Sequence, residues 1–175
     1  MSFQENMNLL RDSAQLQTHL RLFENAVETR HTILRLRPNQ RQNWMGLVVA
    51  HHLNGNLEEA KMVLESYFRS LKVRALLSLG QFAQRQNQNV PQCDVEHSES
   101  LLYYIRILEE LENFTEALSV LDQNEKSRAI VDRQAILETR GRNRVFISLL
   151  LIFRFIQLGY SQSMIRRTQR RHGPP

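Results

Sequence analysis

A repeat period of about 34 residues in the first part of the chain constrains its fold most strongly. The interval from Ala26 to Ala60 equals the interval from Leu10 to Trp44. Around these positions, apolar residues recur at spacings of three and four, which is the pattern of amphipathic helices. Pro38 ends one of these helices, because proline cannot continue the hydrogen-bond ladder of a helix interior. A repeat of this length with two helices predicts a helical solenoid, in which each helix pair packs on the next.

A third helix pair follows after an interruption. Ala117 takes the position of the small residue, which lets two helices approach closely. The interval from Ala60 to Ala117 exceeds one repeat period by about 23 residues. We place these extra residues in the segment 71–94, an insertion or loop in which the polar run Gln84–Asn89 indicates a loop and a short helix at Val73–Phe82 stays open. The expected helices cover about 6–20, 26–36, 41–53, 57–70, 96–112, 114 onward, and 128–139.

These features predict an all-α fold. Trp44, Leu47 and Ala60 stand at the offsets typical of a tetratricopeptide helix pair. We therefore expect a tetratricopeptide-like α-solenoid, with antiparallel helix pairs in a right-handed superhelix and an atypical C-terminal tail. The predicted structural repeat positions are Leu10, Ala26, Pro38, Trp44, Leu47, Ala60, Leu101 and Ala117. The predicted division is two helix pairs at 1–70, an insertion or loop at 71–94, a third pair and the first helix of a fourth at 95–141, and a basic tail at 142–175.

The charge is distributed unevenly along the chain. The net charge is +5, yet all 18 acidic residues lie at or before Glu138. As a result, residues 1–139 carry a charge of −3 and residues 140–175 carry +8. The basic character belongs to the tail alone.

Three interpretations of this tail stay open. Its Arg166-Arg167 and Arg170-Arg171 pairs would attract nucleic acid or an anionic surface. A basic segment without acidic residues is also typical of a disordered end. It is typical, too, of an out-of-frame or intron-derived translation product. We favour the last interpretation, because the change in composition after Gly141 falls inside a repeat.

No residue pattern indicates catalysis, a cofactor or a metal. His51 and His52 are adjacent, so they point about 100° apart on a helix and lack a third ligand at a useful spacing. His97, Ser98 and Glu99 are consecutive and cannot align as base, nucleophile and orienting residue. We expect no catalytic, cofactor-binding or metal-binding residue in this chain.

A small basic edge surrounds the proline between the second and third helices. Arg35, Arg37 and Arg41 flank Pro38. They are either solvated helix ends, where cations complement the helix dipole, or contacts for a partner or for ribosomal RNA phosphates. Both interpretations stay open.

The composition indicates a cytoplasmic protein. A single cysteine, Cys93, excludes an internal disulfide framework. The polar N-terminus does not resemble a secretory signal. No apolar run reaches the roughly 18 residues that a membrane span needs. We therefore expect no membrane partner, and we do not expect direct nucleic-acid binding.

Three parts of the sequence resemble one known family. They are LLRDSAQLQTHLRLFENAVETR, ETRHTILRLRPNQRQNWMGLVVAHHLNGNLEEAKMVLE and EHSESLLYYIRILEELENFTEAL. The most specific element is L-R-P-x-Q-R-x-x-W at Leu36–Trp44, which a generic tetratricopeptide repeat does not contain. These segments resemble the auxiliary, or large, subunit of the N-terminal acetyltransferase A complex, over roughly residues 6–70 and 95–141.

The resemblance implies a non-catalytic scaffold. Members of this family are much longer helical-repeat proteins that wrap around a small acetyl-coenzyme A-dependent catalytic subunit and hold it at the ribosome. There, the partner acetylates the α-amino groups of nascent chains. We expect this chain to be a fragment or truncated homologue that contributes no catalytic residue. A stand-alone tetratricopeptide adaptor that binds a peptide or helix is the alternative, and a nucleic-acid-binding protein acting through the tail is the third hypothesis.

Overall fold

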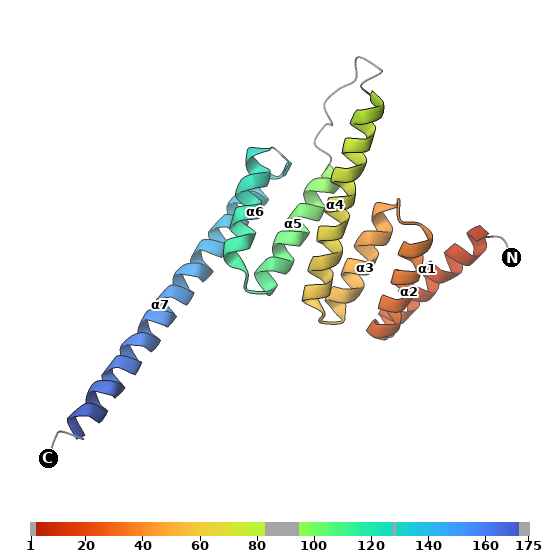
Figure 1. The fold of residues 1–175 in the computed structure, drawn as a ribbon. Helices are drawn as coiled ribbons and strands as arrows, with labels where there is room; N and C mark the ends of the chain where they lie inside the picture. The colour runs from red at the N-terminus through yellow and green to blue at the C-terminus, as the bar shows by residue number, and fades with distance from the viewer. Residues whose placement is uncertain (1–2, 83–94, 128, 172–175) are drawn as a thin grey trace.

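A computed structural model describes residues 3–82, 95–127 and 129–171. Within these ranges the backbone forms α-helices and no strand. Figure 1 shows α1 to α6 side by side in chain order, while α7 extends away from the body. Helices α1 and α2, α3 and α4, and α5 and α6 are consecutive packed pairs, and α7 packs on α6. The helices are α1 (Phe3–His19), α2 (Phe23–Leu36), α3 (Arg41–Leu53), α4 (Leu57–Phe82), α5 (Val95–Glu110), α6 (Phe114–Lys126) and α7 (Arg133–Arg171).

In each of the three helix pairs, the same type of turn connects the first helix to the second. Arg21, Gly55 and Glu112 have positive φ values of 59°, 77° and 60°. They are spaced along the chain as Ala26, Ala60 and Ala117 are. In each turn, the N–H of the next residue donates to a carbonyl five residues earlier at 2.9 Å, which is the hydrogen bond of a left-handed helix end. The sequence period is therefore also a period of the backbone.

The core lies where the repeat pattern predicts it. Ala26, Ala60 and Ala117 are all buried, at 1%, 0% and 0% exposure. A small cluster joins α1 to α2 through Met7, Ala14 and Ile33. A larger cluster runs continuously from α3 to α7, and its buried members are Val48, Ala60, Leu64, Leu101, Tyr104, Ile105, Ile107, Leu108, Ala117, Leu121, Ile130 and Ile136.

Helix α4 is longer than expected. The predicted end near Ser70 is wrong, because the helix continues to Phe82. Residues 73–82, for which a short helix stayed open, are helical as part of α4. The repeat period shows how many residues are extra, but not whether they form a loop or lengthen a helix. Leu, Lys, Arg and Ala, which favour helices, dominate the added part. The polar run Gln84–Asn89 and Cys93 lie outside the described residues.

Helix α7 also differs from its prediction at both ends. It begins at Arg133 and not at 128, because Asp132 accepts a hydrogen bond from the N–H of Ala135 at 3.0 Å. This is the geometry of a helix start. The helix then passes through Gly141 and continues to Arg171. The change in composition at Gly141 is therefore not a break in the backbone, and residues 142–171 are not an irregular end.

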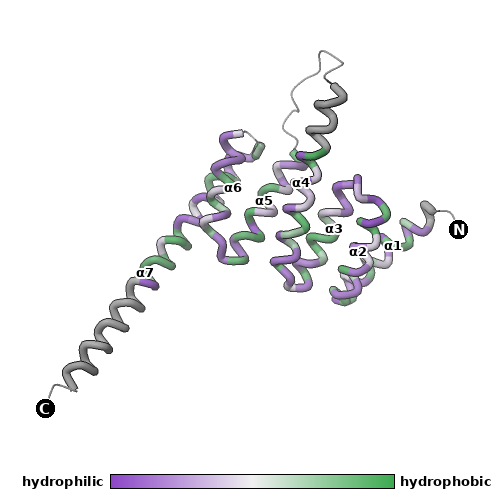
Figure 2. The backbone as a smooth tube through the Cα atoms, viewed as in Figure 1, coloured by the Kyte–Doolittle hydropathy of each residue, from purple (hydrophilic) through white to green (hydrophobic). Residues whose placement is uncertain are grey.

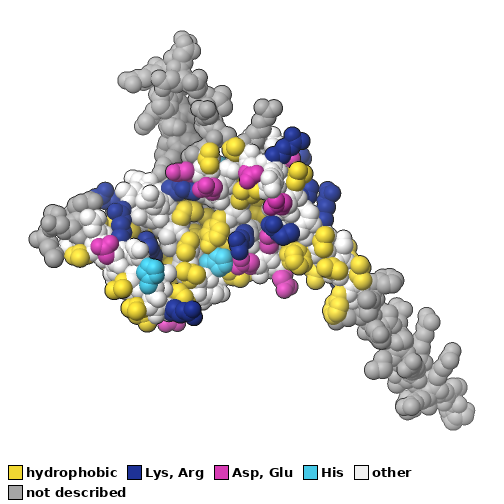
Figure 3. All heavy atoms as spheres, turned by 180° about the vertical axis from the view of Figure 1, so that it is seen from behind, with side chains coloured by type: hydrophobic (Ala, Val, Ile, Leu, Met, Phe, Trp, Pro, Cys, Tyr) yellow, Lys and Arg dark blue, Asp and Glu magenta, His cyan; other side chains and the backbone are white. Residues whose placement is uncertain are grey.

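The middle of α7 carries bulky apolar side chains that are 47–63% exposed. Phe146 stacks on Phe114 of α6, with ring centroids 5.1 Å apart. Beyond this contact the apolar residues extend past the body, as the hydropathy colours of Figure 2 show. Seen from behind in Figure 3, hydrophobic side chains cover the described end of α7. The exposed residues are Val145, Phe146, Leu149, Leu150, Leu151, Ile152 and Phe153.

Candidate protein-binding groove

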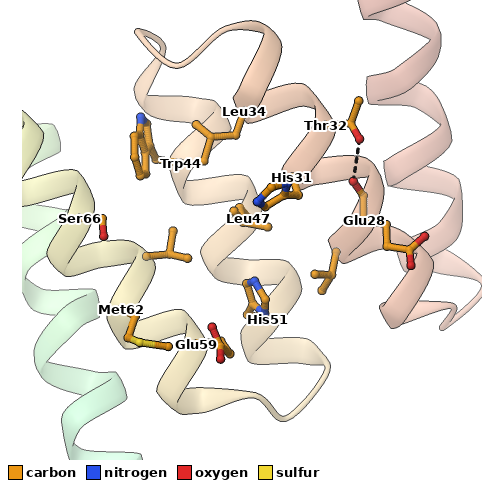
Figure 4. A pocket seen from close by; sticks show the side chains of 12 residues that line it. Glu28, His31, Thr32, Leu34, Trp44, Leu47, His51, Glu59, Met62 and Ser66 are labelled. Carbon is orange, nitrogen blue, oxygen red and sulfur yellow. Dashed lines mark hydrogen bonds between the residues drawn. The ribbon is translucent and has the colours of Figure 1, made fainter.

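Helices α2, α3 and α4 form a groove with a volume of about 730 Å³. Figure 4 shows α3 in the middle, with side chains of α2 and α4 on its two sides. The groove exists because successive helix pairs are stacked, so each first helix lies between the second helices of two neighbouring pairs. Its lining residues are Val27, Glu28, His31, Thr32, Leu34, Trp44, Leu47, His51, Glu59, Met62, Val63 and Ser66.

The groove combines an apolar centre with acidic edges. Trp44 and Leu47 of α3 and Met62 of α4 supply apolar surface. Glu28 of α2 and Glu59 of α4 are exposed carboxylates on opposite sides of it. An apolar centre with a few polar groups is the usual make-up of a site that binds a peptide or a helix.

His51 of α3 is one of the polar residues that line this groove. Burial lowers the pKa of its imidazole, Glu59 opposes that shift, and His31 adds to it. Nδ1 of His51 is buried and has no hydrogen-bond partner among the described residues. The lowered pKa favours the neutral form of the ring.

The segment Leu36–Trp44, the most family-specific in the sequence, shapes one end of the groove. The Trp44 Nε1–H donates to the carbonyl of Pro38 at 2.7 Å. The side chain of Asn43 is buried, and its Nδ2 donates to the carbonyl of Arg37 at 2.8 Å. These bonds fold the connection between α2 and α3 back onto α3 and hold the indole at the edge of the groove.

The predicted basic edge does not act as a single patch. Arg41 donates to the carbonyl of Glu96 at 2.7 Å and lies 3.4 Å and 3.7 Å from the carboxylates of Glu96 and Glu99. It therefore links α3 to α5 within the chain. Arg35 is exposed, and Arg37 is partly buried. The proposed role of these residues in partner contact stays a prediction, and Arg41 already has partners in its own chain.

The structure places the predicted repeat positions in different environments. Leu47 and Leu101 are buried, as are the three alanines. Leu10 and Trp44 are partly buried, and Pro38 is exposed in the turn before α3. The break at Asn54-Gly55-Asn56 indicates a left-handed helix end, and Gly55 adopts it. The positive φ values of Arg21 and Glu112 were not predicted, although the same repeat spacing locates both residues from Gly55.

The other candidate residues serve packing. Nδ1 of His52 lies 2.7 Å from the Tyr103 hydroxyl, and Nε2 lies 2.7 Å from Glu110, so this histidine joins α3 to α5. The Ser98 hydroxyl accepts the N–H of Val131 at 3.1 Å and joins α5 to the segment before α7. Across the described ranges, no group of His, Cys, Asp and Glu could hold a metal ion. None of the described helices is both long enough and apolar enough to cross a membrane.

Stacked helix pairs with an open groove define the class of protein. Such an α-solenoid works by presenting extended surfaces to other proteins. Among the described residues, α2, α3 and α4 form one such surface.

Comparison with known proteins gives the family. No protein-family profile matches the chain. The chain is 35% identical over 135 residues to the N-terminal acetyltransferase A complex auxiliary subunit NAA15 of Arabidopsis thaliana. This match covers 77% of this chain and 13% of that protein. It is 32% identical over 139 residues to the human N-alpha-acetyltransferase 16, a NatA auxiliary subunit. This match covers 78% of this chain and 14% of that protein.

A solved structure gives the same result at the level of the fold. A chain in the "Structure of Naa15/Naa10 bound to HypK-THB" matches 94% of this chain with a TM-score of 0.64 and 32% identity, and the match covers 21% of that chain. Over the matched segment, the chain belongs to the family of auxiliary subunits of the N-terminal acetyltransferase A complex. The resemblance and the all-α solenoid predicted from the sequence are confirmed. The chain spans about one seventh of the length of these curated relatives.

Proposed function

We propose that this chain is a non-catalytic scaffold that binds the catalytic subunit of an N-terminal acetyltransferase A complex. The observation that carries the proposal is the structural match, because the matched chain comes from a structure titled as a complex with Naa10. The relatives are named as auxiliary subunits, which supports a role in N-terminal acetylation without catalysis.

The proposed mechanism is recognition and positioning. A stack of rigid helix pairs holds a partner in a fixed orientation, which lowers the entropic cost of bringing reacting groups together. The catalytic residues and acetyl-coenzyme A would belong to the partner. This chain would supply surface, with the groove of α2, α3 and α4 as the part best built for contact. The site of action would be the cytoplasm, at the ribosome, where the partner acetylates nascent chains.

The experiment is co-expression of the tagged chain with the acetyltransferase catalytic subunit of the same organism. The proposal predicts that the two proteins elute together in size-exclusion chromatography. Met62→Glu would introduce a charge at the apolar centre of the groove, and the matched variant Val73→Glu introduces the same charge at an equally exposed apolar position of α4 that does not line this groove. Failure of the catalytic subunit to co-elute with the unmodified chain contradicts the proposal.

The groove itself favours a second candidate, a stand-alone adaptor that binds a peptide or helix unrelated to acetylation. Its apolar centre and two carboxylates would accept an apolar segment with a basic residue. Under this alternative, Met62→Glu abolishes peptide capture while the catalytic subunit does not co-elute with any variant. The two outcomes separate the candidates.

A further inference from the structure

A second groove lies between α1 and α3, with Arg30 of α2 beneath it. Its volume is about 390 Å³. Arg30 is partly buried, and within the described parts of the chain it forms neither a hydrogen bond nor an ion pair. A charge that has lost part of its hydration gains more from a carboxylate partner than a fully solvated one does. The guanidinium of Arg30 still reaches solvent from the groove, and no carboxylate of the described residues pairs with it.

The surroundings of Arg30 increase this cost. Burial lowers the pKa of its guanidinium, and the positive charge of Arg11 lowers it further. Arg11 itself is engaged, since it donates to Oε1 of Gln40 at 2.9 Å. No described carboxylate offsets the charge of Arg30.

Gly46 makes room for this arginine. A Cβ atom at position 46 would lie 3.0 Å from Nη1 and 3.3 Å from Cδ of Arg30. The arginine therefore lies across α3 where the helix has no side chain. The sequence supplies both the charge and the space that lets it reach the groove.

On its α3 side the groove is apolar apart from Gln42. Val49 and Leu53 are 42% and 45% exposed, and they stand one turn apart beside Gly46 and Ala50. Small residues next to exposed apolar ones let a second helix approach closely. These four residues therefore form an open, apolar face of α3, and the Arg30 guanidinium lies at its edge.

From this arrangement we infer that the α1–α3 groove binds an amphipathic helix of a partner protein that carries an acidic residue within its apolar face. The carboxylate would accept two parallel hydrogen bonds from Arg30, and the apolar residues of the helix would cover Val49 and Leu53. A nucleic acid fits less well, because its binding requires several cations, and residues 1–139 carry a net charge of −3. The inference does not depend on the proposed function.

The first test separates a binding role from a structural one. Arg30→Met keeps most of the volume and removes the unpaired charge. The inference predicts that thermal unfolding of the full chain shifts to the same or a higher temperature. A clear loss of stability in Arg30→Met would assign Arg30 to the fold and overturn the inference.

The second test measures binding directly. The probes are a fluorescent amphipathic peptide with one glutamate in its leucine face, and its twin with glutamine at that position. The glutamate peptide is expected to bind the full chain at least tenfold more tightly than its twin. That difference should disappear in Arg30→Met and shrink in Gly46→Ala, where the added methyl group displaces the guanidinium. Equal binding of both peptides, no binding of either, or Arg30-dependent binding of a short single-stranded RNA would each overturn the inference.

Discussion

Two glycine substitutions test the repeat geometry with opposite expected signs. Gly55 has a φ of 77°, and Gly141 lies inside α7 without a positive φ. A Cβ atom at either position would meet nothing within 4 Å. Gly55→Ala and Gly141→Ala therefore add the same atom to open space and differ only in the backbone conformation that alanine must adopt.

The magnitudes follow from this difference. An L-residue in the left-handed region costs roughly 1–2 kcal/mol, and the lower entropy of the unfolded alanine chain offsets about 0.4–1 kcal/mol of that. We therefore expect Gly55→Ala to lower the free energy of unfolding by about 1 kcal/mol. Gly141→Ala should raise it by about 0.5–1 kcal/mol, because alanine favours an exposed helix interior over glycine.

Thermal unfolding followed by circular dichroism is the assay. A change of about 1 kcal/mol shifts the midpoint of a chain of this size by about 2–4 °C. The two variants should move the midpoint in opposite directions. A stable Gly55→Ala variant would refute the left-handed turn in the second repeat, and a destabilised Gly141→Ala variant would refute the continuous helix through α7.

Further predictions concern the core, a titrating side chain and an inter-repeat link. Ala60→Leu should cost about 1–3 kcal/mol by overpacking, because Ala60 is fully buried; an unchanged unfolding midpoint would contradict the close helix approach at this position. Burial lowers the pKa of His51 in the folded chain. The neutral ring therefore makes its full contribution to the free energy of unfolding above the unfolded pKa of about 6.5. That contribution is lost as the pH falls from this value toward the folded pKa. His51→Gln should therefore lose less stability than the unmodified chain between neutral and mildly acidic pH, and identical pH profiles would contradict this. Arg41→Met should cost about 1 kcal/mol in urea unfolding at low salt and less at high salt; a loss independent of salt would contradict an ionic link to α5.

The sequence predicted the repeat well because the repeat depends on local chemistry. Pro38 and the break around Gly55 place helix ends through backbone restrictions that act on neighbouring residues. The burial of Ala60 and Ala117 follows from the same register. The bounds of α3 agree with the prediction because both of its ends carry such signals.

The same reasoning failed where the signals are not local. The extra residues before α5 could lengthen a helix or form a loop, and the spacing of Ala60 and Ala117 is the same in both cases. The change in composition after Gly141 suggested a structural break, yet the residues that follow still favour a helix.

The candidate sites depend on contacts between residues that are far apart in the sequence, and the sequence alone does not reveal such contacts. Arg41 was grouped with Arg35 and Arg37 because they are close in the chain. Its partners are instead on α5, where Glu96 lies 55 residues further along the sequence. Arg30 carried no signal in the sequence. The role proposed for it rests on two facts of packing, a partly buried guanidinium without a carboxylate partner among the described residues and the space left by Gly46.

Titration of the purified full chain with the purified acetyltransferase catalytic subunit tests the central claim most directly. Isothermal titration calorimetry reports both affinity and stoichiometry. The account predicts saturable one-to-one binding with a Kd on the order of 1 μM, or about −8 kcal/mol, because the chain holds only part of the scaffold of its relatives. No heat of binding, together with an unchanged elution volume of the mixture, would contradict the claim that this solenoid is an auxiliary scaffold.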